Sequence, residues 1–202
     1  SEKLRKTLLG ADGTHLVSFV CSLEDDWKIP TLIQAAQFVA AGIKGVRILI
    51  MGEGRERDSL QSLINKSNVG DYVKLAGRID SEEMPAYLAS SDLYVDTYYT
   101  DKPGGGIGVA VMEALSSGLP VVAGRRPGVE FGVKDNHNGL LFDGGNAKDM
   151  AEKMISLLRN SEMRASFGQA SRAIALKIGD WSSNMAEVEK QYQRLTEDSK
   201  KE

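Results

Sequence analysis

A glycine-rich stretch followed by a helical pattern is the part of the sequence best suited to chemistry. It covers residues 103–124, and glycines 104–106 precede apolar residues at helical spacing. Glycines let a backbone approach an anion closely, and a helix that begins near Ile107 would offer it free N–H groups and a favourable dipole. The stretch therefore predicts a phosphate or pyrophosphate site, although a plain loop before an ordinary helix has the same composition.

Glu113 is the acidic residue of this stretch. It stands on the predicted helix beside the small or apolar residues Val111, Met112 and Ala114. A carboxylate in that place is either solvated at the helix edge or aimed at a hydroxylated ligand. The residues alone leave both interpretations open.

Alternating strands and helices must position this stretch. Short apolar runs predict strands over residues 15–20, 46–51, 73–76, 93–95, 121–122 and 139–142. Amphipathic runs predict helices over residues 31–41 and 55–66, from Ser81 to about Ala89, and from Ala147 onward with breaks near residues 160 and 179.

This order of elements predicts an α/β fold with a parallel sheet covered on both faces. Ligands of such sheets bind beyond the carboxyl ends of the strands. The loops to inspect are therefore residues 21–28, 52–55, 77–81, 97–106 and 124–130.

Composition excludes several classes of function. The 202 residues are 42% hydrophobic, which suits one large globular domain or two very small ones. Neither sign of charge forms a long block, and 25 basic against 28 acidic residues give −3, so no nucleic-acid partner is expected. The longest apolar runs, such as residues 46–51, are too short to span a bilayer.

The single Cys21 favours a reducing, cytoplasmic compartment. Two distant histidines, His15 and His137, do not make a metal site with it, so no metal is expected. The N-terminal residues lack the extended apolar region that a signal peptide would show. Because the sequence starts on Ser1 without a Met, it is expected to be a processed or excised piece.

Several ordered motifs carry a family resemblance. GIGVAVMEALSSGLPVVAG resembles the signature of the C-terminal, donor-binding domain of family four glycosyltransferases of the GT-B class. MGEGRERDSL, VKLAGRIDSEEMPAYLASSDLYV and DNHNGLLFDGGNAKDMAEKMISLL are similar to other segments of that domain, in the same order. The resemblance covers nearly the whole chain.

The resemblance implies one Rossmann-like three-layer domain over residues 1–202 that grips a nucleotide diphosphate sugar without a metal or other cofactor. A missing N-terminal domain would bind the acceptor, and helices over residues 161–202 would pack toward that domain. The domain would be cytoplasmic. For the full-length protein, the inner face of a membrane is a second expected location.

Residue roles follow from the same resemblance. Glu113 matches the second glutamate of the family's E-x7-E motif and would accept hydrogen bonds from ribose hydroxyls. Residues 77–79, with Ile79, would lie against the base. The backbone N–H groups that would hold the diphosphate and face the sugar belong to Gly106, Ile107, Gly108 and Val109.

The sequence departs from the family at charged positions. Gly105 stands where the family has its first glutamate, which bonds the donor sugar, and Ser22 stands in place of an arginine. Lys28 would replace the family's lysine if the loop shifts by one residue; ungapped, that position is Trp27. Losing one such charged donor typically costs a few kcal/mol of transition-state stabilisation. Three residues on nearby loops could compensate or simply be solvated: Lys102, Arg125 and Arg126.

Two hypotheses follow. The chain is either the donor half of a retaining glycosyltransferase or a related binding or scaffold module that has lost its chemistry. A nicotinamide-binding domain would need the glycine fingerprint after its first strand, where this chain reads CSLEDD.

Overall fold

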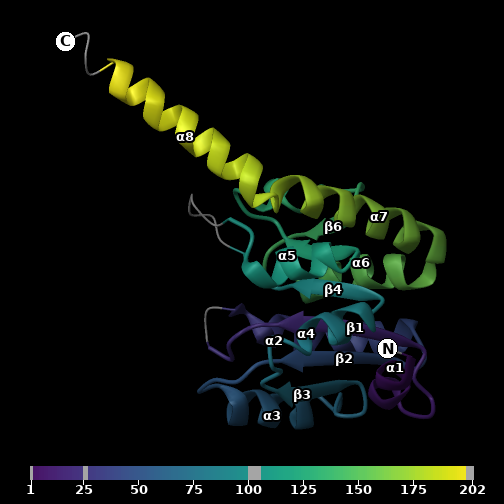
Figure 1. Ribbon diagram of the computed structural model, residues 1–202. Coiled ribbons are helices and arrows are strands. Elements are labelled where there is room, and N and C mark those ends of the chain that lie inside the picture. Colours follow the sequence, from purple (N-terminus) through teal and green to yellow (C-terminus); the bar gives the residue numbers. More distant parts are fainter. Residues whose placement is uncertain (1, 25–26, 100–105, 199–202) are drawn as a thin grey trace.

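A six-stranded parallel sheet lies at the centre of the fold (Figure 1). The computed structural model describes residues 2–24, 27–99 and 106–198. The strands are β1 (His15–Val20), β2 (Val46–Met51), β3 (Val73–Gly77), β4 (Leu93–Asp96), β5 (Val121–Gly124) and β6 (Gly139–Phe142). Their order is β3-β2-β1-β4-β5-β6, and every neighbouring pair is parallel. The predicted α/β class and all six strands are confirmed.

The strand order reverses direction between β1 and β4. From β1 the chain builds outward through β2 to β3, then crosses back to β4 on the other side and continues to β6. The crevice above such a reversal is where open α/β sheets bind their ligands. The carboxyl ends of β1 and β4 are therefore the first place to look for a site.

Helices cover both faces of the sheet. One face packs against α2 (Ile29–Gly42), α3 (Arg57–Lys66) and α6 (Ala147–Arg159). The other face packs against α1 (Glu2–Leu9), α4 (Met84–Ala89), α5 (Val109–Ser116) and α7 (Ser161–Ile178). Strand β1 feeds both cores, because Val17 and Phe19 point to the first face and Leu16 points to the second. The resulting three layers are those of a Rossmann-like domain.

Four predicted helix starts are wrong by two or three residues. Helix α2 begins at Ile29 and not at Thr31, and α3 begins at Arg57 and not at Arg55. Helix α4 begins at Met84 and not at Ser81, because Pro85 is suited to the first turn of a helix. The N–H groups of Glu83 and Met84 both donate to the carbonyl of Asp80, which forms a turn ahead of the helix. Helix α5 begins at Val109, with Gly108 as its N-cap, and not near Ile107. The glycines therefore precede the helix by more than the sequence pattern indicates.

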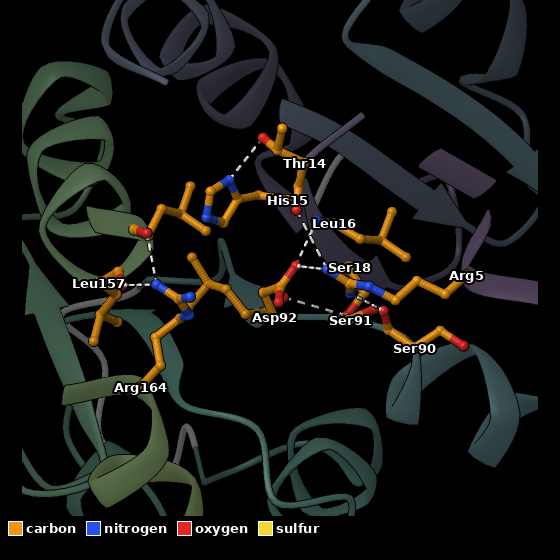
Figure 2. A network of polar contacts seen from close by, with 12 residues as sticks. Arg5, Thr14, His15, Leu16, Ser18, Ser90, Ser91, Asp92, Leu157 and Arg164 are labelled. Atoms are coloured by element: carbon orange, nitrogen blue, oxygen red, sulfur yellow. Dashed lines mark hydrogen bonds and ion pairs between the residues drawn. The ribbon is translucent and has the colours of Figure 1, made fainter. Parts of the chain in front are cut away.

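A polar network fastens the amino ends of β1 and β4 to α1 (Figure 2). Arg5 of α1 donates to the carboxylate of Asp92, with 2.8 Å between Nη2 and Oδ2, and to the carbonyl of Ser90. The same carboxylate accepts the N–H of Leu16 at 2.8 Å. This network lies at the opposite end of the strands from the crevice.

Helix α8 (Trp181–Asp198) projects away from the body of the domain (Figure 1). Its root is fixed to the end of α7, because the Asn184 amide donates to the carbonyl of Ile178 at 2.8 Å. Met185, Val188 and Tyr192 share one face and are 41%, 43% and 67% exposed. Within the described ranges, we find no helix with both the length and the apolar character needed to cross a membrane.

Candidate functional site

Backbone hydrogen bonds join the loops that follow β1, β2 and β3. The N–H of Leu23 donates to the carbonyl of Glu53 at 2.9 Å, and the N–H of Gly52 donates to the carbonyl of Gly77 at 2.8 Å. Gly52 has a φ of +144°, and a Cβ there would lie 1.7 Å from the carbonyl oxygen of Cys21. Only glycine fits this contact, so Gly52 fixes how these loops stand at the carboxyl edge of the sheet.

A pocket of about 590 Å³ opens between the carboxyl ends of β1 and β4. We name it the β1–β4 pocket. Its walls come from three loops and include Ser22, Trp27, Tyr98, Gly106, Ile107, Gly108, Val109 and Arg126. It lies where the strand order reverses, as expected for a ligand site of this fold.

Residues 106–108, which we call the glycine loop, form one wall of this pocket. A Cβ added at Gly106 or Gly108 would meet nothing within 4 Å, so neither glycine is required by packing inside the domain. In the described part of the chain, the N–H groups of Gly106, Ile107 and Gly108 have no acceptor. Free N–H groups ahead of a helix N-terminus suit an anion. Gly105 lies outside the described residues.

A second pocket surrounds Glu113, on the other side of the start of α5. It has a volume of about 510 Å³ and is lined by Arg78, Ile79, Asp80, Ser81, Glu82, Met84 and Glu113. We name it the Glu113 pocket. The Glu113 carboxylate is exposed on the second turn of α5, so it is available to a ligand.

The structure brings most of the predicted site residues together. A further hollow of about 390 Å³ touches both Val109 and Glu113, and so connects the two pockets along α5. The glycine loop, Glu113 and Ile79 thus lie along one continuous surface. Their individual roles stay predictions.

The first loop presents an indole and not an ammonium to the β1–β4 pocket. Trp27 lines the pocket, its Nε1 donates to the Ser22 hydroxyl at 2.8 Å, and its carbonyl accepts the Thr97 hydroxyl. Lys28 is the N-cap residue of α2, with a φ of +53°, and is not among the residues that line this pocket. The predicted phosphate contact of Lys28 stays untested.

Arg125 and Arg126 are ion-paired. Arg125 is about half exposed and lies 3.2 Å from Asp135 and 3.4 Å from Asp143. Arg126 is only 1% exposed and pairs with Asp96 at 2.6 Å, so the expectation of a solvated Arg126 is wrong. Lys102 lies outside the described residues.

The Arg126–Asp96 pair was not found by sequence reasoning. Burial raises the pKa of the Asp96 carboxyl, and the neighbouring Arg126 guanidinium opposes that shift. A usable signal existed in the sequence. Asp96 follows an apolar run and Arg126 follows the next one, and complementary charges at the ends of adjacent parallel strands can meet.

Neither Cys21 nor Tyr94 has the properties of a nucleophile or an acid in this pocket. Burial raises the pKa of the Cys21 thiol to about 12, and the nearby Asp96 adds to the shift. Burial also raises the pKa of Tyr94, whose hydroxyl donates to the carbonyl of Val20 at 3.4 Å. Across residues 2–24, 27–99 and 106–198, no group of His, Cys, Asp and Glu is arranged to hold a metal ion.

The parallel sheet and the glycine loop at its reversal point define a Rossmann-like α/β domain. Residues 1–174 match the family model described as "Glycosyl transferases group 1". The chain therefore belongs to this glycosyltransferase family, and the family resemblance drawn from the motifs is confirmed.

Curated relatives are longer proteins. The chain is 31% identical over 173 residues to a Corynebacterium glutamicum GDP-mannose-dependent monoacylated alpha-(1-6)-phosphatidylinositol monomannoside mannosyltransferase, covering 84% of this chain and 44% of that protein. A Mycobacterium tuberculosis GDP-mannose-dependent alpha-(1-6)-phosphatidylinositol monomannoside mannosyltransferase is 27% identical over 161 residues, covering 78% and 42%. The chain spans less than half the length of these relatives.

Solved structures show the same domain within larger chains. TarM from Staphylococcus aureus, in a complex that contains UDP, superposes with a TM-score of 0.74 at 28% identity, over 81% of this chain and 32% of that one. Anabaena HepE in complex with UDP superposes with a TM-score of 0.83 at 23% identity, over 96% and 52%. The second likeness is one of fold.

Proposed function

We propose that this chain is the donor-binding half of a retaining glycosyltransferase, which moves a sugar from a nucleotide diphosphate sugar to an acceptor. An N-terminal domain outside this sequence would hold the acceptor. The face of α8 that carries Met185, Val188 and Tyr192 would pack toward that domain. The observation that carries the proposal is the position of α5. The start of this helix borders the β1–β4 pocket, and the Glu113 carboxylate on its second turn is exposed in the Glu113 pocket.

In this proposal the two pockets divide the donor between them. The Glu113 carboxylate accepts hydrogen bonds from the ribose hydroxyls, and Ile79 lies against the base. The N–H groups of the glycine loop and Val109 bind the diphosphate. When the bond from the anomeric carbon to the phosphate oxygen breaks, negative charge develops on the leaving diphosphate, and these N–H groups with the α5 dipole stabilise it. Lys28 adds charge neutralisation if its side chain turns toward the pocket.

The names of similar proteins suggest the probes. The two mannosyltransferases are described as dependent on GDP-mannose, and the TarM complex contains UDP. Both UDP and GDP are therefore suitable first ligands for this chain.

A second candidate function is a binding or scaffold module without transfer activity. It is favoured by the first loop, where Ser22 and Trp27 bond to each other in the region where the family has cations. The positive charge of Arg126 is also neutralised, since it pairs with Asp96. Both hypotheses predict nucleotide binding, and only the first predicts sugar transfer.

Nucleotide binding is tested by thermal unfolding of the chain with UDP or GDP. At 100 times its Kd, a ligand adds about 2.7 kcal/mol to the free energy of unfolding. For a domain of this size that is a rise in Tm of roughly 5–11 °C. Glu113→Ala should remove this rise, whereas Glu152→Ala, an exposed carboxylate on α6, should keep it.

Two results would contradict the proposal. If neither nucleotide raises Tm at millimolar concentration, this half does not bind the donor by itself. If Glu113→Ala responds like the wild type, the ribose contact is elsewhere. Transfer itself is measured in the full-length protein, because donor and acceptor must be held together in one cleft. Nucleotide binding without sugar transfer there would favour the scaffold hypothesis.

A further inference from the structure

A buried ion pair lies directly beneath the glycine loop. Asp96 is the last residue of β4, and Arg126 follows β5 by two residues. Their side chains are 7% and 1% exposed, and 2.6 Å separates Oδ2 of Asp96 from Nη2 of Arg126. Because the two charges neutralise each other, the pair adds little net charge to the β1–β4 pocket.

The Arg126 guanidinium bonds to the chain on both sides of the glycine-rich segment. Nη1 donates to the carbonyl of Tyr98 at 2.9 Å, and Nη2 donates to the carbonyl of Gly106 at 3.5 Å. The Tyr98 ring lies 5.3 Å from the guanidinium carbon, and the Tyr98 N–H donates to Asp96 at 3.2 Å. One side chain therefore connects the segment that leaves β4 with the segment that enters α5.

The two glycines of the glycine loop have no side chains to hold them, and Ile107 between them is the loop residue that packs against the core. Glycine has more backbone freedom than any other residue, and nothing lies within 4 Å of the places where side chains at Gly106 and Gly108 would begin. Backbone donors bind and stabilise an anion best when their positions are fixed in advance. The order of this loop must therefore come from the packing of Ile107 against the core and from contacts made by residues outside the loop, of which Arg126 supplies one.

We infer that Arg126, held in place by Asp96, is a positioning residue that fixes the glycine loop over the β1–β4 pocket so that its N–H groups can bind a diphosphate. The ligand part of this inference rests on the proposed function; the loop-fixing part does not. The other explanation is that the pair only stabilises the fold.

A double variant separates the two explanations. Replacing a buried ion pair by apolar residues of similar size often leaves stability unchanged or raises it, whereas removing one partner leaves an uncompensated charge. Asp96→Leu combined with Arg126→Met should therefore keep the fold while it removes the bonds to Tyr98 and Gly106. Arg126→Lys keeps the charge beside Asp96, but a single ammonium cannot reproduce the planar fork.

The first measurement is the backbone order parameter of Gly106, Ile107 and Gly108, obtained from 15N NMR relaxation without nucleotide. We expect it to fall from the range of ordered backbone, about 0.85, to below about 0.6 in the double variant, with unchanged values in β1. The second measurement is the Kd for UDP or GDP by calorimetry, which we expect to rise at least tenfold while Tm stays within a few degrees. Arg126→Lys should fall between the wild type and the double variant in both.

Arg5→Met is the matched control. It removes a partly buried ion pair, with Asp92, at the far end of the strands (Figure 2). It should lower Tm without changing the order parameters of the glycine loop or the nucleotide Kd.

Wild-type order parameters at the glycine loop in the double variant would overturn the inference. If that variant does not fold, wild-type order parameters in Arg126→Lys would overturn it. Lower order parameters with an unchanged Kd would overturn the ligand part. Failure of the proposed function is distinguishable, because it appears as wild-type protein that binds neither nucleotide.

Discussion

Gly108→Ala separates a glycine kept for ligand approach from one kept for folding. Gly108 is the N-cap of α5, with φ −73° and ψ 160°, a conformation that alanine adopts without strain. A Cβ there would meet nothing within 4 Å. The domain therefore has no internal reason to exclude alanine, whereas a diphosphate lying against the N–H of Gly108 would.

The expected effects of Gly108→Ala on stability and on nucleotide binding differ in size. Replacing glycine by alanine gains about 0.4–1 kcal/mol by restricting the unfolded chain. Alanine is a poorer N-cap than glycine by an amount of the same order, about 0.5–1 kcal/mol. The net change in Tm is then under about 4 °C for a domain of this size. Losing one hydrogen bond to a charged phosphate costs about 1.5–3 kcal/mol, which is a rise in Kd of about 10- to 150-fold.

The assay measures Tm and the Kd for UDP or GDP on the same samples. Gly52→Ala is the contrasting variant, since its Cβ would lie 1.7 Å from the carbonyl oxygen of Cys21, and it should lose well over 10 °C or fail to fold. An unchanged Kd for Gly108→Ala would refute the close approach of phosphate at this residue. A large fall in its Tm would show that Gly108 is required by the fold.

Two further predictions concern titrating groups. Partial burial raises the pKa of the Cys21 thiol to about 12, so very little of it is ionised at pH 7.5. Iodoacetamide should therefore modify the native protein far more slowly than the protein in denaturant, as followed by mass spectrometry, and rapid native labelling would contradict the raised pKa. Burial lowers the pKa of His15, helped by Arg164 and Arg5 and opposed by Asp92, so its neutral form is favoured in the folded state. A lowered pKa means that this contribution to stability is complete above the unfolded value of 6.5 and is lost as pH falls through and below it. The drop in Tm from pH 7.5 to 5.5 should therefore be smaller in His15→Gln than in the wild type, and an equal drop would contradict this.

The strands and the carboxyl edge of the sheet could be predicted because the apolar runs that indicate them are local in the sequence. Residues 48–51 form a continuous apolar run that is buried on both faces, as is typical of parallel strands, and Arg47 before them is only partly buried. The start of α5 was misplaced because its N-cap, Gly108, has no side chain to mark it. The start of α4 was misplaced because Ser81 imitates a cap, while Pro85 sets the first turn.

The candidate site was only partly predictable. Glu113 and the glycine loop belong to one short stretch, so a motif was enough to find them. The Arg126–Asp96 pair depends on β4 and β5 being neighbours in the sheet, so the opposite charges that follow these two strands become a signal only when that strand order is assumed. Likewise, whether Trp27 or Lys28 lies on the pocket wall depends on a shift of one residue in the loop after β1, and only the folded loop defines it.

Helix α8 converts a small tilt at its start into a larger displacement at its end. Its root is stiff, because the Asn184 N–H and amide bond back to Asp180 and Ile178 at 3.0 Å and 2.8 Å. Eighteen residues make a rod of about 27 Å, so a tilt of about 10° at the root moves its far end by about 5 Å. Angular changes at the end of α7, too small to alter the packing of the core, are thus magnified at the far end of α8.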